Sequence, residues 1–207
     1  MQDLKETTSY RTALKDKTLT CAMQLFARRG IRAVKMDDIA AALGISKRTL
    51  YELYDDKEAL LFTGMKKYQE QHRERMNRIV ATSSNVMEVI LKFYEVHMEE
   101  SRDVNPLFYS DLEKYPKILE ALHQEKQEKM DVYMEFMMRG VDEGYFRPDI
   151  NYTLIRHLFD ALGKYMMENH LYEVYSFKEL YRNMLFVSLR GFCTAKGVKI
   201  LDDTIFI

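Results

Sequence analysis

The sequence has few of the residues that build β-rich, disulfide-bonded or membrane-spanning proteins. Its 207 residues include only 3 Pro and 8 Gly, too few for a fold with many tight turns. The two cysteines, Cys21 and Cys193, lie far apart, which fits a reducing compartment without a disulfide framework. No run approaches the roughly 18 apolar residues of a membrane helix. The start, MQDLKETTSY, lacks the apolar segment of a signal peptide. We therefore expect a cytoplasmic protein with no membrane partner.

The overall charge does not by itself predict a protein that binds polyanions. A net charge of −1 gives no reason to expect binding to a polyanion from composition alone. Hydrophobic residues make up 47% of the chain, enough for a substantial core. They recur with a period of about 3.6 almost everywhere, and no convincing alternating strand precedes the tail. The sequence predicts an all-α fold of one large domain or two small ones.

The first 56 residues predict three helices. Gly30 and Gly44 are placed to end the first and second of them, and Ser46 is a suitable N-cap for the third. Two short helices joined by about three residues, with Gly in the turn, are typical of a helix-turn-helix motif. In that motif the second helix enters the DNA major groove. The three helices are expected at Arg11–Arg29, Asp37–Leu43 and Lys47–Leu53.

The stretch GISKRTLYELYDDKEAL at 44–60 contains the second of these short helices. Ile45 and Leu50 are expected to face the core, which leaves a polar face outward. Tyr54 is better interpreted as a core residue. Asp55 or Asp56 can cap the long helix that begins near Lys57.

The rest of the chain is also helical by pattern. Six helices are expected at about 57–81, 85–101, 104–113, 117–143, 151–171 and 177–196. The tail, GVKILDDTIFI, is apolar enough to pack against the protein. We therefore predict a three-helix helix-turn-helix domain at 1–56, followed by a larger six-helix domain at 57–207.

The motif resembles the N-terminal part of the TetR family of bacterial transcriptional regulators. The matching stretches are MDDIA at 36–40, LGISK at 43–47 and TLY at 49–51, and the matching single positions are Ala22, Leu25, Phe26, Gly30, Lys57, Glu58 and Leu60. Position 48, where many relatives have Gly, is not part of the match. The resemblance covers about residues 14–62. It implies a DNA-binding head, an effector-binding and dimerisation domain, and a homodimer on a palindromic operator. It implies a small molecule that releases DNA.

The resemblance also assigns candidate DNA contacts. Lys47 is expected to meet phosphate, and Arg48 to read guanine or to remain a solvated charge. Tyr51 is expected to donate to phosphate, the alternative being packing against the first helix. Lys57 can share a phosphate with the amides of its helix N-terminus. The full predicted set is Lys35, Ser46, Lys47, Arg48, Thr49, Tyr51 and Lys57.

Five other positions are less clear. Lys35 stands where relatives place a Ser or Thr cap, so that cap is lost, at a cost of about 1 kcal/mol, and Lys35 can instead contact phosphate. Glu52 either accepts from cytosine or repels phosphate, and the sequence leaves this open. The arginines at the end of the first helix and after it, Arg28, Arg29 and Arg32, favour a solvated helix end over DNA contacts.

The second domain is rich in Met, Tyr, Phe and His. Met suits adaptable apolar pockets, although each such residue at helical spacing is more often ordinary core. The predicted effector-binding residues are Tyr94, His97, Phe108, Met134 and Met138. His97 and His157 have no further ligands at metal-binding spacing, so no metal and no cofactor is expected. No set of nucleophile, base and orienting residue can be assembled from the sequence, and no Gly-rich phosphate-binding loop is present. We therefore expect no enzyme and no catalytic residue.

The last two long helices carry small and apolar residues along one stripe. In TetR-type proteins the corresponding helices pair with their copies, which makes this stripe the predicted homodimer interface. The alternative is that the stripe faces the core of its own chain. The predicted interface residues are Leu158, Leu162, Met184, Val187 and Gly191.

The sequence thus predicts a regulator that binds double-stranded operator DNA and a small apolar or aromatic effector, and the resemblance implies a repressor. A protein partner in place of the small effector is the first alternative. A helical interaction protein that has lost DNA binding is the second, and the presence of Lys47, Thr49, Tyr51 and Lys57 argues against it.

Overall fold

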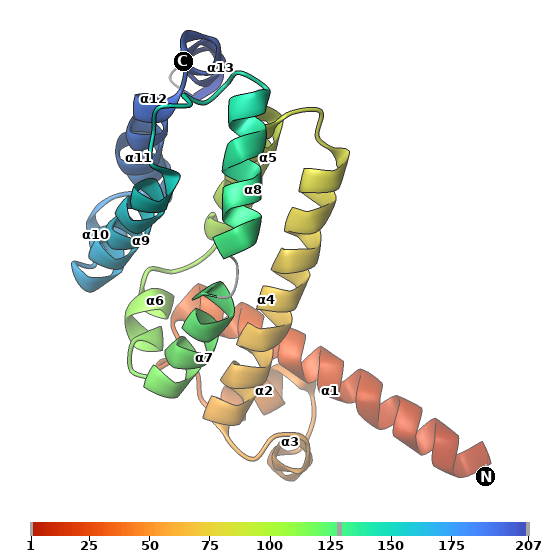
Figure 1. Cartoon of the computed structure of the whole chain (residues 1–207). Coiled ribbons are helices and arrows are strands. Elements are labelled where there is room, and N and C mark those ends of the chain that lie inside the picture. The colour runs from red at the N-terminus through yellow and green to blue at the C-terminus, as the bar shows by residue number, and fades with distance from the viewer. Residues whose placement is uncertain (1, 128–129, 206–207) are drawn as a thin grey trace. The chain divides into compact units, whose positions relative to one another are not determined.

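The computed structural model describes the backbone of residues 2–127 and 130–205 and the side chains of residues 10–122 and 130–204. Within these ranges the protein is helical and contains no strand, only an isolated bridge between Phe146 and Cys193 (Figure 1). The all-α prediction is confirmed. The chain forms two compact units: unit 1 contains residues 1–72 and 103–123, and unit 2 contains residues 73–102 and 124–207.

Unit 1 contains the three expected N-terminal helices together with a later segment of the chain. Its elements are α1 (Gln2–Arg29), α2 (Met36–Leu43), α3 (Lys47–Leu53), the first part of α4 (Lys57–Thr82), α6 (Leu107–Leu112) and α7 (Pro116–Gln127). Phe26, Ile39, Leu50 and Leu60 are fully buried and come from four of these helices. Their side chains form one core that holds α2 and α3 against α1 and α4.

The helix ends in unit 1 follow the local sequence signals. Gly30 and Gly44 adopt φ +83° and +64°, the left-handed backbone that glycine enters without a Cβ clash. Ser46 Oγ accepts from the Thr49 amide at 3.0 Å, so it caps α3 as expected. Asp56 Oδ1 accepts from the Ala59 amide at 2.7 Å and caps α4. Residues close in sequence therefore set the end of α1, the turn between α2 and α3, and the start of α4.

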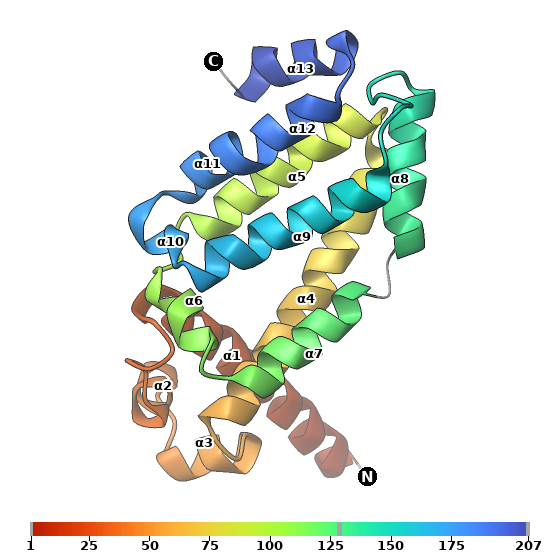
Figure 2. The same cartoon turned by 60° about the vertical axis from the view of Figure 1, so that its left-hand side comes forward.

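Unit 2 is built around a second core. Its elements are the end of α4, α5 (Val86–Ser101), α8 (Met130–Asp142), α9 (Tyr152–Glu168), α10 (Leu171–Val174), α11 (Phe177–Leu180), the π-helical stretch η1 (Tyr181–Phe186), α12 (Val187–Phe192) and α13 (Ala195–Ile205). Phe146 and Phe192 are buried and meet edge to face with centroids 5.3 Å apart. Both views show α9 running beside the continuous rod of α11, η1 and α12 (Figure 2).

Several predicted boundaries were wrong. The helix expected over 117–143 falls on α7 and α8, and residues 128–129 between them lie outside the described part. The helix expected over 151–171 ends at Glu168, and the helix expected over 104–113 is limited to α6. The tail forms α13, whose Leu201 is fully buried, so the tail does pack. Among the described residues from Lys57 onward there are therefore more than the six helices expected.

Within residues 2–127 and 130–205, no helix combines the length and the apolar character needed to cross a membrane.

Candidate DNA interface and regulatory sites

The helix α3 presents a polar face to solvent and an apolar face to the core. Leu50 is completely buried, which fixes the rotation of the helix. The Arg48 side chain is 89% exposed, and Lys47 and Tyr51 are exposed beside it. Because a helix-turn-helix reads DNA with the N-terminal part of its second helix, this is the face that would meet the major groove.

The exposed charges on α3 have partners within the chain. Lys47 Nζ lies 2.8 Å from Asp37 Oδ1, and this hydrogen bond and the carboxylate charge raise the pKa of Lys47. Arg48 Nε donates to Glu52 Oε1 at 3.0 Å. Exposed ion pairs of this kind contribute little free energy, so phosphate can replace either carboxylate at small cost. In the structure Glu52 therefore accepts a hydrogen bond from Arg48. Its expected effect on DNA, either accepting from cytosine or repelling phosphate, stays open.

The hydroxyl groups at the start of α3 take part in its cap. Ser46 Oγ, besides accepting from the Thr49 amide, shares a 2.8 Å hydrogen bond with Thr49 Oγ1. Lys35, by contrast, provides no side-chain cap for α2. The Asp38 carboxylate instead accepts from the Lys35 amide at 2.8 Å, which replaces part of the missing cap.

Lys57 has a contact that the sequence does not reveal. Its ammonium donates to the carbonyl oxygens of Ile31 and Val34, both at 3.0 Å. An ammonium has three donors, so these two bonds leave one N–H for phosphate. Lys57 therefore ties the turn between α1 and α2 to the start of α4.

Tyr54 is buried as predicted. Its hydroxyl donates to the Lys15 carbonyl at 3.3 Å, and the Lys15 ammonium lies 5.2 Å from the ring centroid. Burial of the phenol raises the pKa of Tyr54. The neighbouring turn of α3 is therefore anchored on α1.

Asp111 in α6 is a structural residue that sequence reasoning missed. Its buried carboxylate accepts from the Arg32 amide at 2.8 Å, across 79 residues of sequence. Nearby, the Asn105 amide donates to the Ala27 carbonyl at 2.7 Å, near the end of α1. Together with Lys57, these contacts fix the turn that leads into α2. A single aspartate near a tyrosine-rich segment carries no local signal for such a role.

Four of the predicted effector-binding residues lie in unit 2. The Tyr94 ring contacts Phe186 and Tyr181, at centroid distances of 5.0 and 6.0 Å. The His97 ring lies 5.8 Å from Tyr181. These contacts join α5 to η1. A π-helical stretch such as η1 is frequent at functional sites.

The remaining predicted effector residues are less closely grouped. Met134 is half-buried against the unit 2 core, whereas Met138 is exposed. Phe108 is buried in the core of unit 1, so the structure does not group it with the other four.

A polar group inside unit 2 was also missed from sequence. The Tyr133 hydroxyl donates to the Tyr152 carbonyl at 3.1 Å, and the Arg156 guanidinium lies 5.3 Å from the Tyr133 ring centroid. Desolvation raises the pKa of Tyr133 to about 12. Arg156 also pairs with Asp160 at 3.0 Å. This arrangement places hydrogen-bonding groups within an otherwise apolar layer.

The predicted dimer residues are either exposed or half-buried. Leu158 is 42% exposed and Val187 is 54% exposed, whereas Leu162 and Met184 are half-buried. Gly191 is exposed, and a Cβ added to it would meet no atom within 4 Å. The inner faces of α9 and α12 meet through Phe159 and Phe192, so their outer faces remain exposed side by side.

The described residues contain no group of three or more His, Cys, Asp or Glu side chains that could hold a metal ion. Cys193 is buried, and desolvation raises the pKa of its thiol to about 12.

The fold and the exposed face of α3 define a helix-turn-helix DNA-binding protein. Residues 19–63 match the family model described as "Bacterial regulatory proteins, tetR family". This N-terminal part of the chain is therefore similar to the DNA-binding domain of TetR-family regulators, and the full-length proteins that the chain resembles are transcriptional regulators.

Named relatives agree with this assignment. The chain is 25% identical over 156 residues to the HTH-type transcriptional repressor KstR2 of Mycolicibacterium smegmatis, covering 72% of this chain and 76% of that protein. The structure of the ketosteroid transcriptional regulator KstR2 of Mycobacterium tuberculosis is similar with a TM-score of 0.53 and 21% identity, covering 87% of this chain and 95% of that one. A transcriptional regulator from Saccharomonospora viridis in complex with choline has a TM-score of 0.70 and 18% identity, with 88% and 99% coverage. The two structures support the fold.

Proposed function

We propose that this protein is a homodimeric repressor that binds a palindromic operator and is released by a small apolar or aromatic molecule. The observation that carries the DNA-binding part is the outward polar face of α3, fixed by buried Leu50 and capped by Ser46. The named KstR2 relatives are repressors, which supports the direction of regulation.

The proposed DNA contacts have different roles. Lys47 and Tyr51 bind phosphate, and Arg48, the most exposed of the three, reads a base edge. Lys57 uses its third donor for phosphate while it holds the turn before α2. Lys35 is exposed at the start of α2 and adds a phosphate contact.

Ser46 and Thr49 complete the proposed DNA contact set. Their hydroxyls cap α3 in the free protein and lie at its exposed N-terminal end. A backbone phosphate at this end of the helix would meet both hydroxyls and the helix dipole.

The test is selection from a pool of random-sequence duplexes at fixed salt, followed by sequencing of the retained DNA. A palindrome recovered with the wild-type protein and lost with Arg48→Ala would support the dimeric reader. Glu74→Ala, which alters one exposed residue of α4 outside the proposed contact set, is the control. A folded protein that retains no DNA even at low salt would refute DNA binding, because phosphate contacts strengthen as salt falls.

The proposed dimer joins the exposed stripes of α9 and of the η1–α12 rod to those of a second copy. Leu158 and Val187 are large apolar side chains at its surface, Leu162 and Met184 support them, and Gly191 allows close approach. Burying such a stripe is favourable in proportion to its apolar area. Two symmetric copies present the same patch to each other.

Gly191→Leu tests this interface sharply. A Cβ added at Gly191 meets no atom of its own chain within 4 Å, and Gly191 is exposed, so a larger side chain can extend into solvent in the monomer. We expect helical circular dichroism to be unchanged and sedimentation to shift from dimer to monomer. Gly191→Ala, the smaller matched change, is expected to retain the dimer. A Gly191→Leu protein that remains dimeric at micromolar concentration would exclude this interface.

The effector is proposed to bind in unit 2 near Tyr94, His97, Met134 and Met138. Apolar side chains with a few polar groups are the usual lining of small-molecule sites. Because the named relative is a ketosteroid regulator, ketosteroids are the first compounds to screen by thermal shift. A compound that stabilises the protein and releases operator DNA would support an effector-controlled repressor. If no compound class does so, a protein partner at unit 2 becomes the better hypothesis.

A further inference from the structure

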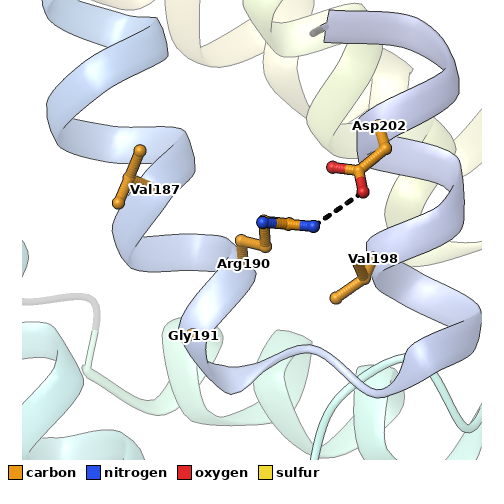
Figure 3. Close-up of a pocket in the computed structure, with 5 residues that line it drawn as sticks. All are labelled: Val187, Arg190, Gly191, Val198 and Asp202. Atoms are coloured by element: carbon orange, nitrogen blue, oxygen red, sulfur yellow. Dashed lines mark hydrogen bonds and ion pairs between the residues drawn. The ribbon is translucent and has the colours of Figure 1, made fainter.

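An open groove lies between α12 and α13 in unit 2. It offers about 690 Å³ of space and is lined by Val187, Arg190, Gly191, Val198 and Asp202. Figure 3 shows Arg190 from α12 and Asp202 from α13 pointing toward each other across the groove. Arg190 Nη2 lies 2.8 Å from Asp202 Oδ2, while Val187 and Val198 flank the pair.

The ion pair across this groove is open to solvent. The side chain of Arg190 is 51% exposed and that of Asp202 is 40% exposed. Exposed pairs typically contribute about 0–1 kcal/mol, so this contact adds little to the stability of a single chain. Each group can therefore exchange its partner for an equivalent one on another molecule without a large loss.

The groove is continuous with the apolar surface proposed for the dimer. Val187 and Gly191 belong to both, and the empty space beside Gly191 opens into the groove. A small molecule is the less suitable occupant, because ligand sites enclose most of the ligand and are usually lined by aromatic side chains. The lining of this groove contains two valines, one glycine and one ion pair.

Symmetry adds a physical reason for a second copy as the occupant. A two-fold interface must be self-complementary, since each copy presents the same patch to the other. A groove with one cation on one wall and one anion on the other meets this condition without any further residue. Two copies that face each other across the axis can form two equivalent ion pairs.

We propose that Arg190 of one copy pairs with Asp202 of the second copy, and that this exchange of ion pairs directs self-association at the groove. The inference rests on the dimer proposed above and specifies the charges that select the partner. The valines on the groove walls supply apolar contact, and the two crossed pairs set the register. Complementary charges of this kind contribute mainly to specificity and to the salt dependence of association.

Two charge-reversal variants, measured alone and as a mixture, test whether Arg190 and Asp202 pair between copies. Arg190→Glu makes both charges of the groove negative, and Asp202→Lys makes both positive. Each variant alone is expected to dimerise at least about tenfold more weakly than the wild type, because like charges face each other twice. In an equimolar mixture, native mass spectrometry should find the heterodimer well above the statistical half of all dimers. Only pairing between copies produces that excess.

The double variant Arg190→Glu, Asp202→Lys is the matched control. It is expected to recover homodimerisation, since both crossed pairs form with reversed polarity. If the mixture of single variants stays at the statistical half, the pair acts within one chain and the proposal is wrong. Failure of the dimer itself is a separate result, because the wild type alone would then sediment as a monomer. In a thermal-shift assay, ketosteroid probes should raise the melting temperature of Arg190→Glu and of the wild type equally. A smaller increase for Arg190→Glu would assign the groove to a small ligand and overturn the proposal.

Discussion

Substituting Asp111 tests how a distant helix supports the DNA-reading turn. In the structure Asp111 lies on α6, and its buried carboxylate accepts from the Arg32 amide at 2.8 Å. A Cβ added at Gly30 would lie 3.1 Å from Asp111 Oδ2, which shows how closely α6 covers this turn. Asp111→Ala removes the acceptor and leaves the amide to find a new partner.

The expected magnitude follows from the type of bond. A hydrogen bond to a charged group contributes about 1.5–3 kcal/mol, and this one is partly buried. We expect Asp111→Ala to reduce the free energy of unfolding by about 1.5–3 kcal/mol. Asp111→Asn retains an acceptor oxygen but loses the charge, so about half that loss is expected.

Urea unfolding followed by circular dichroism, at one fixed protein concentration, measures the loss. Asp55→Ala is the matched control, because it removes an exposed carboxylate from the same unit and changes the net charge equally. Operator affinity of Asp111→Ala should also fall, since the turn before α2 is less constrained. If the free energies of unfolding of Asp111→Ala and Asp55→Ala differ by less than about 0.5 kcal/mol, the Asp111 carboxylate does not hold the turn and the reasoning fails.

Three further predictions concern single side chains. Tyr51→Phe should weaken operator binding roughly tenfold in a gel-shift assay with unchanged unfolding free energy, because only an exposed hydroxyl is lost; equal affinity would remove Tyr51 from the interface. Lys57→Met should lower the free energy of unfolding, because the ammonium donates to two carbonyls. It should also lower operator affinity and reduce the slope of log affinity against log salt by about one per copy, because Lys57 is proposed to contact phosphate. An unchanged slope would leave Lys57 with a purely structural role. Iodoacetamide at pH 8 should alkylate half-buried Cys21 before Cys193. Burial raises the pKa of the Cys193 thiol to about 12, and the reactive thiolate forms only as the pH rises toward that value. Mass spectrometry that finds Cys193 alkylated first in the native protein would contradict this prediction.

The sequence by itself determined the local geometry of the DNA-binding head. Gly30 and Gly44 take the left-handed backbone that ends α1 and α2, and Ser46 caps α3. Leu50 is buried as its place on the core face of the helix predicted, and Tyr54 is buried as the resemblance implied. These features depend on φ, ψ and hydrogen bonds within a few residues, so a short stretch of sequence contains the information.

Only the tertiary structure decided the partners of the longer-range side chains. Lys57 bonds carbonyls 26 and 23 residues away, and Asp111 bonds an amide 79 residues away. Phe108 is in the unit 1 core although its sequence neighbourhood suggested the effector site. Periodicity gives the face of a helix but not the helix that packs on it, because that choice depends on how the whole chain fills its cores. The pairing of Arg190 with Asp202 across the α12–α13 groove was therefore visible only after folding.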